Sequence, residues 1–287
     1  TLTQKSIDVM KKLDGPLTIT TYINMLDEDY FRGMPRYYNE DFERFEKFVR
    51  FKPEMKLKYV YYYDKVQNSS LDRRYPGLSD EERLAKICEV EEWDVKDILT
   101  PEEIHKIEDL SGEYNKFARV IERGNGQKSI LRIYDDNMRH PSETEITAAF
   151  KRMVIKSPMV AFLEGHGERS INGAGDRDYY AFSRYKAFRN SLVNQGFDNM
   201  TLCLDSLDRI PENVDILVIS DVRTPLSEKE QVIIENYIAQ GRNLLIAGEP
   251  RRQEQMNAII APLGLAFLPG LLVQESKDYP ADLILSK

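Results

Sequence analysis

The chain has 287 residues, of which 41% are hydrophobic and 31% charged, and its formal net charge is −8. This composition is typical of a folded, water-exposed protein that is long enough for two domains. The acidic balance argues against a nucleic-acid surface, because phosphate binding relies on clustered lysine and arginine.

No stretch approaches the roughly 20 continuous apolar residues that a membrane-spanning helix needs. The closest run, residues 259–273, is interrupted repeatedly by proline and glycine. The chain starts at Thr1 without a signal-peptide pattern, so either a leader was removed or the chain was cut from something longer. Cys88 and Cys203 fall in different predicted domains, on a helix and on a strand. We therefore expect no disulfide and no zinc site.

The first 156 residues alternate strand and helix signals. Residues 17–24 follow the turn Asp14-Gly15-Pro16 and predict a strand, and residues 56–63 predict a second one. Between them, residues 41–51 predict a helix whose buried face carries the residues Phe42, Phe45, Phe48 and Val49. This order indicates a parallel βαβ pair.

A charged helical insert, residues 71–112, follows the second strand. Ser79 with Glu82, and Thr100 with Glu103, are capping-box pairs that predict two helix starts. Their apolar stripes are Leu84, Ile87 and Cys88 in the first helix, and Ile104, Ile107 and Leu110 in the second. The insert is longer than a minimal unit of this kind requires.

A hairpin and a helix complete the first domain. Asn125-Gly126 predicts a tight turn between strands at residues 116–123 and 128–134. Ser142 with Glu145 predicts a further helix, which buries Ile146, Ala149, Phe150 and Met153. Residues 1–156 thus have the order βαβ, helical insert, ββα, which is a thioredoxin-like layout.

The second predicted domain, residues 157–287, has short continuous apolar runs that are typical of buried parallel strands. These runs are residues 159–163, 200–204, 215–220 and 243–247. We expect helices at residues 178–195, after the capping pair Ser227 and Glu230, and at residues 253–261. Strands alternating with helices predict a doubly wound parallel sheet.

Ligands of open parallel sheets bind beyond the carboxyl ends of the strands. Three loops qualify, at residues 164–169, 221–225 and 248–252, and the first two face each other if the strand order is flavodoxin-like. The candidate binding residues are Glu164, His166, Glu168, Arg169, Asp221 and Arg223.

The residues leave several interpretations of this edge open. His166 with Glu168 or Asp221 has the chemistry to bind a metal or move a proton. The alternatives are glycines that only shape a tight turn, or a contact to a ligand or partner without catalysis. The loop lacks the glycine spacing of a nucleotide-binding motif, no strand ends in a nucleophile elbow, and Cys203 is expected to pack within a strand. We therefore predict no catalytic residue, no metal and no cofactor.

Three segments resemble one family over nearly the whole chain. They are KSIDVMKKLDGPLTITTYIN, MVAFLEGHGE and VDILVISDVRTPLSEKEQVIIENYIAQGRNLLIAGEP. Together they resemble the GldG-type auxiliary components of ABC transport, which are associated with gliding motility in Bacteroidetes. The second half is also similar to a glutamine-amidotransferase-like domain.

The resemblance implies an excised ectodomain on the periplasmic face of the cytoplasmic membrane, anchored by flanking helices. Its partners would be permease and ATPase subunits or envelope proteins, without nucleic acid, and its amidotransferase-like fold would be degenerate and inactive. We expect a non-enzymatic scaffold or binding subunit. The alternatives are a metal-assisted hydrolase using His166, Glu168 and Asp221, and a sensor for a small ligand such as a sugar or a peptidoglycan fragment.

Overall fold

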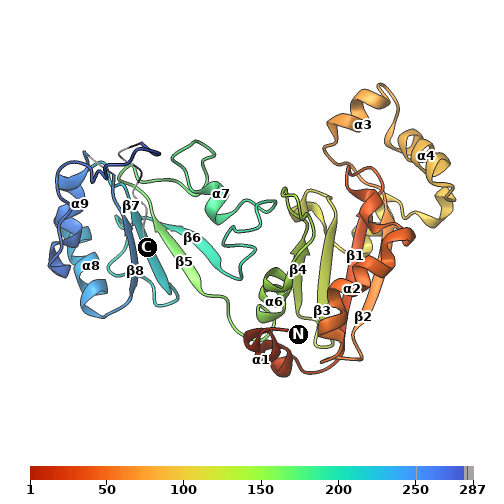
Figure 1. Ribbon diagram of the computed structural model, residues 1–287, viewed down its shortest axis with the longest axis horizontal. Helices are drawn as coiled ribbons and strands as arrows, with labels where there is room; N and C mark the ends of the chain where they lie inside the picture. Colours follow the sequence, from red (N-terminus) through yellow and green to blue (C-terminus); the bar gives the residue numbers. More distant parts are fainter. Residues whose placement is uncertain (250, 281–282, 284–287) are drawn as a thin grey trace. The chain divides into compact units, whose positions relative to one another are not determined.

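The computed structural model describes residues 1–249, 251–280 and 283. The chain divides into two compact units, and the principal division falls between Ser157 and Pro158. Two short segments of the second half, Lys186–Asn190 and Asn194–Gly196, group with the first unit. Each unit is built on its own four-stranded sheet (Figure 1).

The first unit has a mixed sheet and six α-helices. Its strands are β1 (Leu17–Asn24), β2 (Lys56–Tyr62), β3 (Ala118–Arg123) and β4 (Lys128–Arg132). Its helices are α1 (Gln4–Lys12), α2 (Tyr38–Val49), α3 (Ser69–Arg74), α4 (Asp80–Glu91), α5 (Pro101–Ile107) and α6 (Glu143–Lys151). The strand order is β2-β1-β3-β4, with β1 and β2 parallel and the β3–β4 hairpin antiparallel. The predicted βαβ, helical insert and ββα order is confirmed.

Both faces of this sheet are covered, because alternate residues of each strand point to opposite sides. Leu17, Ile19 and Ile121 pack on one side against α1, α2 and α6. Tyr22, Tyr62 and Val120 pack on the other side beneath α5. The end of β2 and the segment after β1 form a third cluster with α4.

Two apolar positions of the predicted stripes are exposed. Phe42 is 47% exposed, because the buried face of α2 carries Asp41, Phe45 and Phe48. Phe42 projects about 60° further round the helix axis than Phe45, the nearest of these residues. Ile107, the last residue of α5, is 52% exposed. The capping boxes that begin α4, α5 and α6 are all present as predicted.

Asp27, in the segment after β1, is a buried carboxylic acid with one free oxygen. Its Oδ2 accepts the N–H of Phe117 at 2.8 Å, whereas Oδ1 has no partner. Burial raises the pKa of Asp27 to about 6. The folded protein therefore holds a proton here that the unfolded chain releases near its ordinary pKa of about 3.9.

We expect Asp27→Asn to remove this pH dependence. A carboxyl group whose pKa is raised on folding loses stabilisation as pH rises through the window, here from about 4 to 6. The wild-type free energy of unfolding, minus that of Asp27→Asn, should fall by about 2 kcal/mol between pH 4 and pH 7. Urea titrations of both proteins across this range measure the difference, and a flat difference would contradict the assignment.

The second unit has an all-parallel sheet. Its strands are β5 (Met159–Leu163), β6 (Asp198–Leu202), β7 (Ile216–Ser220) and β8 (Asn243–Ala247), and its helices are α7 (Tyr180–Ser183), α8 (Glu228–Ala239) and α9 (Gln253–Ile260). The order β6-β5-β7-β8 is that of a flavodoxin-like sheet, with the switch point between β5 and β7. The predicted doubly wound sheet is confirmed. Because β8 is an edge strand, Leu245 is 49% exposed rather than buried.

The short 3₁₀ helices are η1 (Tyr30–Gly33), η2 (Pro35–Tyr37), η3 (Val95–Asp97), η4 (Ser111–Glu113) and η5 (Ala261–Leu263). In the part of the chain that the structure describes, no helix combines the length and the apolar character needed to cross a bilayer.

Helices α8 and α9 lie together on one face of the second sheet (Figure 1). Leu217 and Ile219 of β7 pack there against Ile233 and Met256. The opposite face, with Phe162, packs against Ile171 and other residues of the connection between β5 and β6.

The predicted long helix at residues 178–195 is wrong. Only α7 forms there, and it is four residues long. Asn194 shows why, since its Nδ2 donates to the carbonyl oxygens of Lys186 and Phe188 at 2.9 Å each. Side chains that bind nearby backbone carbonyls compete with helical hydrogen bonding. The aromatic residues Phe182, Tyr185 and Phe188 are consequently about 40% exposed instead of forming a buried face.

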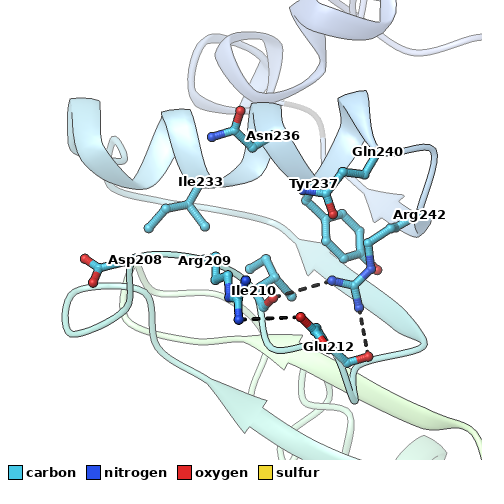
Figure 2. A pocket seen from close by; sticks show the side chains of 9 residues that line it. All are labelled: Asp208, Arg209, Ile210, Glu212, Ile233, Asn236, Tyr237, Gln240 and Arg242. Atoms are coloured by element: carbon cyan, nitrogen blue, oxygen red, sulfur yellow. Dashed lines mark hydrogen bonds and ion pairs between the residues drawn. The ribbon is translucent and has the colours of Figure 1, made fainter.

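Arg242, directly before β8, forms hydrogen bonds with the connection that precedes β7. Its guanidinium donates to the carbonyl oxygens of Ile210, Pro211 and Val214 and stacks over the ring of Tyr237 at 4.5 Å. Arg242, Tyr237 and Ile210 are among the residues that line a recess of about 80 Å³ beneath α8 (Figure 2). Because these donors of Arg242 already bind backbone carbonyls, we interpret the recess as structural.

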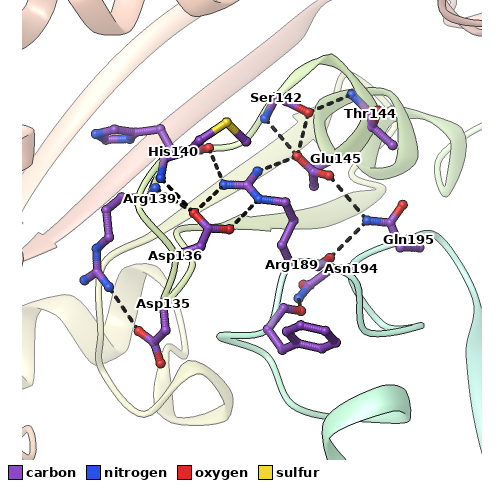
Figure 3. A network of polar contacts seen from close by, with 12 residues as sticks. Asp135, Asp136, Arg139, His140, Ser142, Thr144, Glu145, Arg189, Asn194 and Gln195 are labelled. Atoms are coloured by element: carbon purple, nitrogen blue, oxygen red, sulfur yellow. Dashed lines mark hydrogen bonds and ion pairs between the residues drawn. The ribbon is translucent and has the colours of Figure 1, made fainter. Parts of the chain in front are cut away.

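Arg189 anchors the segment Lys186–Asn190 within the first unit (Figure 3). Its guanidinium binds both carboxylate oxygens of Asp136, at 2.6 and 2.9 Å, and Oε2 of Glu145 at 2.7 Å. It also stacks over the ring of Tyr134 at 4.5 Å. Bidentate, charge-assisted contacts of this kind are among the strong hydrogen bonds of proteins.

Candidate functional site

The candidate site lies at the carboxyl edge of the second sheet, where β5 and β7 end side by side. The β5 loop (residues 164–170) and the β7 loop (residues 221–226) are joined through their backbones. The N–H groups of Arg223 and Thr224 donate to the carbonyl oxygen of His166 at 2.9 and 3.1 Å. The two loops therefore face each other, as the flavodoxin-like order predicts.

His166 lies between two carboxylates. Its Nδ1 is 3.5 Å from Oε1 of Glu168, and its Nε2 is 3.3 Å from Oε2 of Glu230. The backbone N–H of His166 also donates to Oε2 of Glu168 at 2.6 Å. The side chain of Glu168 is completely buried and that of His166 is 12% exposed. The imidazole is thus held inside the fold rather than presented to solvent.

Glu230 was not among the predicted site residues. It belongs to the capping box of α8, where the Oγ and N–H of Ser227 donate to its Oε2 at 2.6 and 2.8 Å. Burial opposes its ionisation, but these bonds and the nearby His166 outweigh burial and hold the pKa of Glu230 below its ordinary value. The capping signal was visible in the sequence, whereas its contact with His166 was not.

Asp221 and Arg223 form a looser pair. Asp221 is 1% exposed, has a φ of +54°, and donates its N–H to the carbonyl oxygen of Ala247 at 2.9 Å. Within the described residues neither of its carboxylate oxygens has a hydrogen-bond partner, and Nε of Arg223 lies 3.9 Å from Oδ2. Asp221 is therefore a buried carboxyl group at the start of the β7 loop, and its backbone binds the end of β8.

Glu164 and Arg169 are engaged away from His166. Ser170 Oγ donates to Oε1 of Glu164 at 3.2 Å. The guanidinium of Arg169 forms an ion pair with Glu249 and donates to the carbonyl oxygen of Arg177 at 2.8 Å. Glu249 belongs to the third candidate loop, of which Pro250 lies outside the described residues. Of the six predicted residues, His166 thus lies beside Glu168 and Asp221 beside Arg223, whereas Glu164 and Arg169 each bind residues outside the predicted set.

This arrangement favours a structural contact of His166 with Glu168 and Glu230 over metal binding or proton transfer. The imidazole of His166 contacts the carboxylate of Glu230, and both side chains are largely buried. Within residues 1–249, 251–280 and 283, no group of three or more histidine, cysteine, aspartate or glutamate side chains is arranged to hold a metal ion. Cys203, expected within a strand, lies just beyond β6, where it is exposed and its Sγ donates to Asp205 at 2.6 Å.

Gly167 lies where the β5 loop and the β7 loop pack closely against each other. Its φ is +78°, and a Cβ added there would lie 3.1 Å from side-chain carbons of Arg223. We expect Gly167→Ala to cost about 1–2 kcal/mol from the left-handed backbone, plus the displacement of Arg223. The control is Gly241→Ala, since Gly241 has a similar φ of +67° and open space around it. Urea unfolding of both variants measures this, and equal losses would show that the loops are not in close contact.

The comparison with protein families bears on the same unit. Residues 157–271 match the family model of an ABC-type uncharacterized transport system. The second unit is therefore similar to the auxiliary components of ABC transport systems. Comparisons with curated proteins and with solved structures found no match. The match covers less than half of the chain, and most of the matched residues belong to the second unit.

Proposed function

We propose that this protein is a non-enzymatic auxiliary subunit, a scaffold or binding component, of an ABC transport system. The observation that carries this proposal is the family match, which includes all four strands of the second sheet, the β5 loop and the β7 loop. The active partners would be a permease and an ATPase.

The geometry of the carboxyl edge supports a role without turnover. A catalytic acid or base must reach a substrate proton, and a nucleophile must be presented at a strand end. Here His166 and Glu168 are turned inward and Arg169 is bound to Glu249. These charged side chains of the β5 loop thus form contacts within the fold, among them those of His166 with Glu230 and of Arg169 with Glu249.

The finer parts of the proposal derive from the resemblance to GldG-type proteins. We propose a location on the periplasmic face of the cytoplasmic membrane, with anchoring by helices outside this chain, and a role in gliding motility. Fractionation of cells that express the tagged full-length protein tests the location. Loss of colony spreading in a deletion strain, restored by the wild-type gene, tests the link to motility.

The decisive experiment is reconstitution with the permease and ATPase of the same transport system. We expect the full-length protein to co-purify stoichiometrically with the permease in detergent and to change the rate of ATP hydrolysis by the reconstituted complex. The permease–ATPase complex alone is the control. If the protein neither associates with the complex nor alters its ATPase rate, the proposed function is wrong.

Elemental analysis tests the metal-assisted hydrolase, which is the alternative from a different functional class. A hydrolase of that kind would purify with stoichiometric metal, and the metal would be lost in His166→Ala. We expect no stoichiometric metal in either protein, because His166 pairs with Glu168 and Glu230 in a buried contact. Metal retained by the wild type and lost in the variant would favour the hydrolase.

A further inference from the structure

The first unit contains a buried guanidinium whose donors are not all used. Arg119, on β3, has a fully buried side chain, and its Nη2 donates to Oδ1 of Asp41 at 2.5 Å. Among the residues that the structure describes, its Nε and Nη1 have no hydrogen-bond partner. The group lies over the rings of Phe117 and Phe45, at 4.9 and 5.9 Å. A buried donor without an acceptor costs free energy, so these two nitrogens call for an acceptor.

Three further arginines pair with Asp41 or with a second buried carboxylate, Asp29. Nε of Arg44 is 3.3 Å from Asp41, Nε of Arg32 is 2.7 Å from Asp29, and Arg139 also pairs with Asp29. We call Arg32, Arg44, Arg119 and Arg139 the arginine cluster. Four guanidinium groups thus share two buried carboxylates, with the more exposed Asp135 as a second partner of Arg139 at 3.1 Å.

The arginine cluster is buried at its base and open at its rim. The side chains of Arg32, Arg44 and Arg139 are 26%, 25% and 24% exposed, whereas that of Arg119 is 0% exposed. The arginine cluster therefore combines three partly exposed guanidinium groups with one that is fully buried. Unpaired guanidinium donors in a low-dielectric environment attract an anion strongly.

His140 lies among these cations. Its ring contacts Phe117 edge to face at 6.5 Å between centroids, and its buried Nδ1 has no hydrogen-bond partner in the described part of the chain. Burial, together with the charges of Arg119, Arg44 and Arg32, lowers the pKa of His140 to about 3, against a smaller opposing effect of Asp41. The imidazole is therefore neutral at physiological pH and adds another unused nitrogen beside Arg119.

We propose that the arginine cluster and His140 form a binding site for an anionic oxygen group, a carboxylate or a phosphate, of a ligand. Guanidinium groups bind both kinds of oxygen with charge-assisted hydrogen bonds. The ligand would satisfy the free nitrogens of Arg119. This site lies outside the family match and does not depend on the proposed transport function.

The competing explanation is purely structural. Arg119 would then be held only by Asp41 and by cation–π contacts with the two phenylalanine rings. The two explanations differ at His140. A bound anion would favour the protonated imidazole and raise its pKa, whereas a structural cluster would leave that pKa unchanged when anions are added.

The test is a proton NMR titration of the histidine side chains at constant ionic strength, with inorganic phosphate or with acetate. We expect a saturable shift of the His140 signals and a higher His140 pKa with at least one anion, and no such change at the exposed His105. Saturation with phosphate alone indicates a phosphate ligand, and saturation with acetate alone a carboxylate.

Variants at the rim separate binding from folding. We expect Arg32→Gln combined with Arg44→Gln to bind at least tenfold more weakly while retaining the wild-type near-UV circular dichroism. Arg50→Gln is the matched control, because Arg50 directly follows α2, the helix of Arg44, but is 71% exposed and pairs with the exposed Glu46. Absence of a saturable shift with both anions, or equal binding by the double variant, would overturn the proposal.

Discussion

Asp41→Ala is expected to lower the free energy of unfolding by about 3–5 kcal/mol, the cost of removing one partner from a buried ion pair. Asp41 accepts hydrogen bonds from Arg119 at 2.5 Å and from the hydroxyl of Tyr59 at 3.0 Å. Without this carboxylate, the fully buried guanidinium of Arg119 loses its direct hydrogen-bond partner. Desolvation of a charge is costly unless the charge is paired, so the loss should be large.

Urea unfolding of the wild type and three variants measures this effect. Glu46→Ala, on the same helix, breaks the exposed pair with Arg50 and should cost no more than about 0.5 kcal/mol. Asp41→Leu combined with Arg119→Met removes both charges and should recover much of the loss. A loss below about 1 kcal/mol for Asp41→Ala would contradict this prediction, because it would show that Arg119 does not become an unpaired buried charge in the variant.

Arg189→Met is expected to destabilise the first unit by about 2–3 kcal/mol, somewhat less than a fully buried pair because Asp136 is partly exposed. Glu145 is only 3% exposed and would lose a charge-assisted bond, although Ser142 and Gln195 still donate to it. The segment Lys186–Asn190 would lose the ion pairs of Arg189 with Asp136 and Glu145 (Figure 3).

The effect of Arg189→Met should depend on pH in a defined direction. The hydrogen bonds from Arg189 lower the pKa of Asp136 to about 2. A carboxyl group with a lowered pKa stabilises the fold above its unfolded pKa of about 3.9 and loses that effect as pH falls toward the folded value. The difference between wild type and variant should therefore shrink from pH 4 to pH 2. Backbone amide exchange at residues 186–190 should also accelerate, and unchanged exchange would contradict this role.

The strands and helix starts were largely predictable because their signals are local. The bounds of β1, β5 and β8 are those predicted, and every predicted capping box is present. A capping box needs only two residues three positions apart, and a buried parallel strand needs only a short apolar run. The order of these elements then limited the topology to a few arrangements.

The candidate site was predictable as a place and not as a set of contacts. Strand order alone places the β5 loop opposite the β7 loop. The sequence did not indicate that Glu230 contacts His166 or that Arg169 turns toward Glu249. The helix predicted at residues 178–195 failed for a related reason, since Arg189 and Asn194 form polar contacts that helical periodicity does not register.

The sequence by itself determined two α/β units and their strand positions, because these follow from residue spacing along the chain. The resemblance to transport auxiliary components came from whole sequence segments. Only the tertiary structure decided which charges meet. Asp41 and Arg119 are 78 residues apart in the chain. Such pairs form when the sheet brings distant segments together, and burial then determines the energy of each contact.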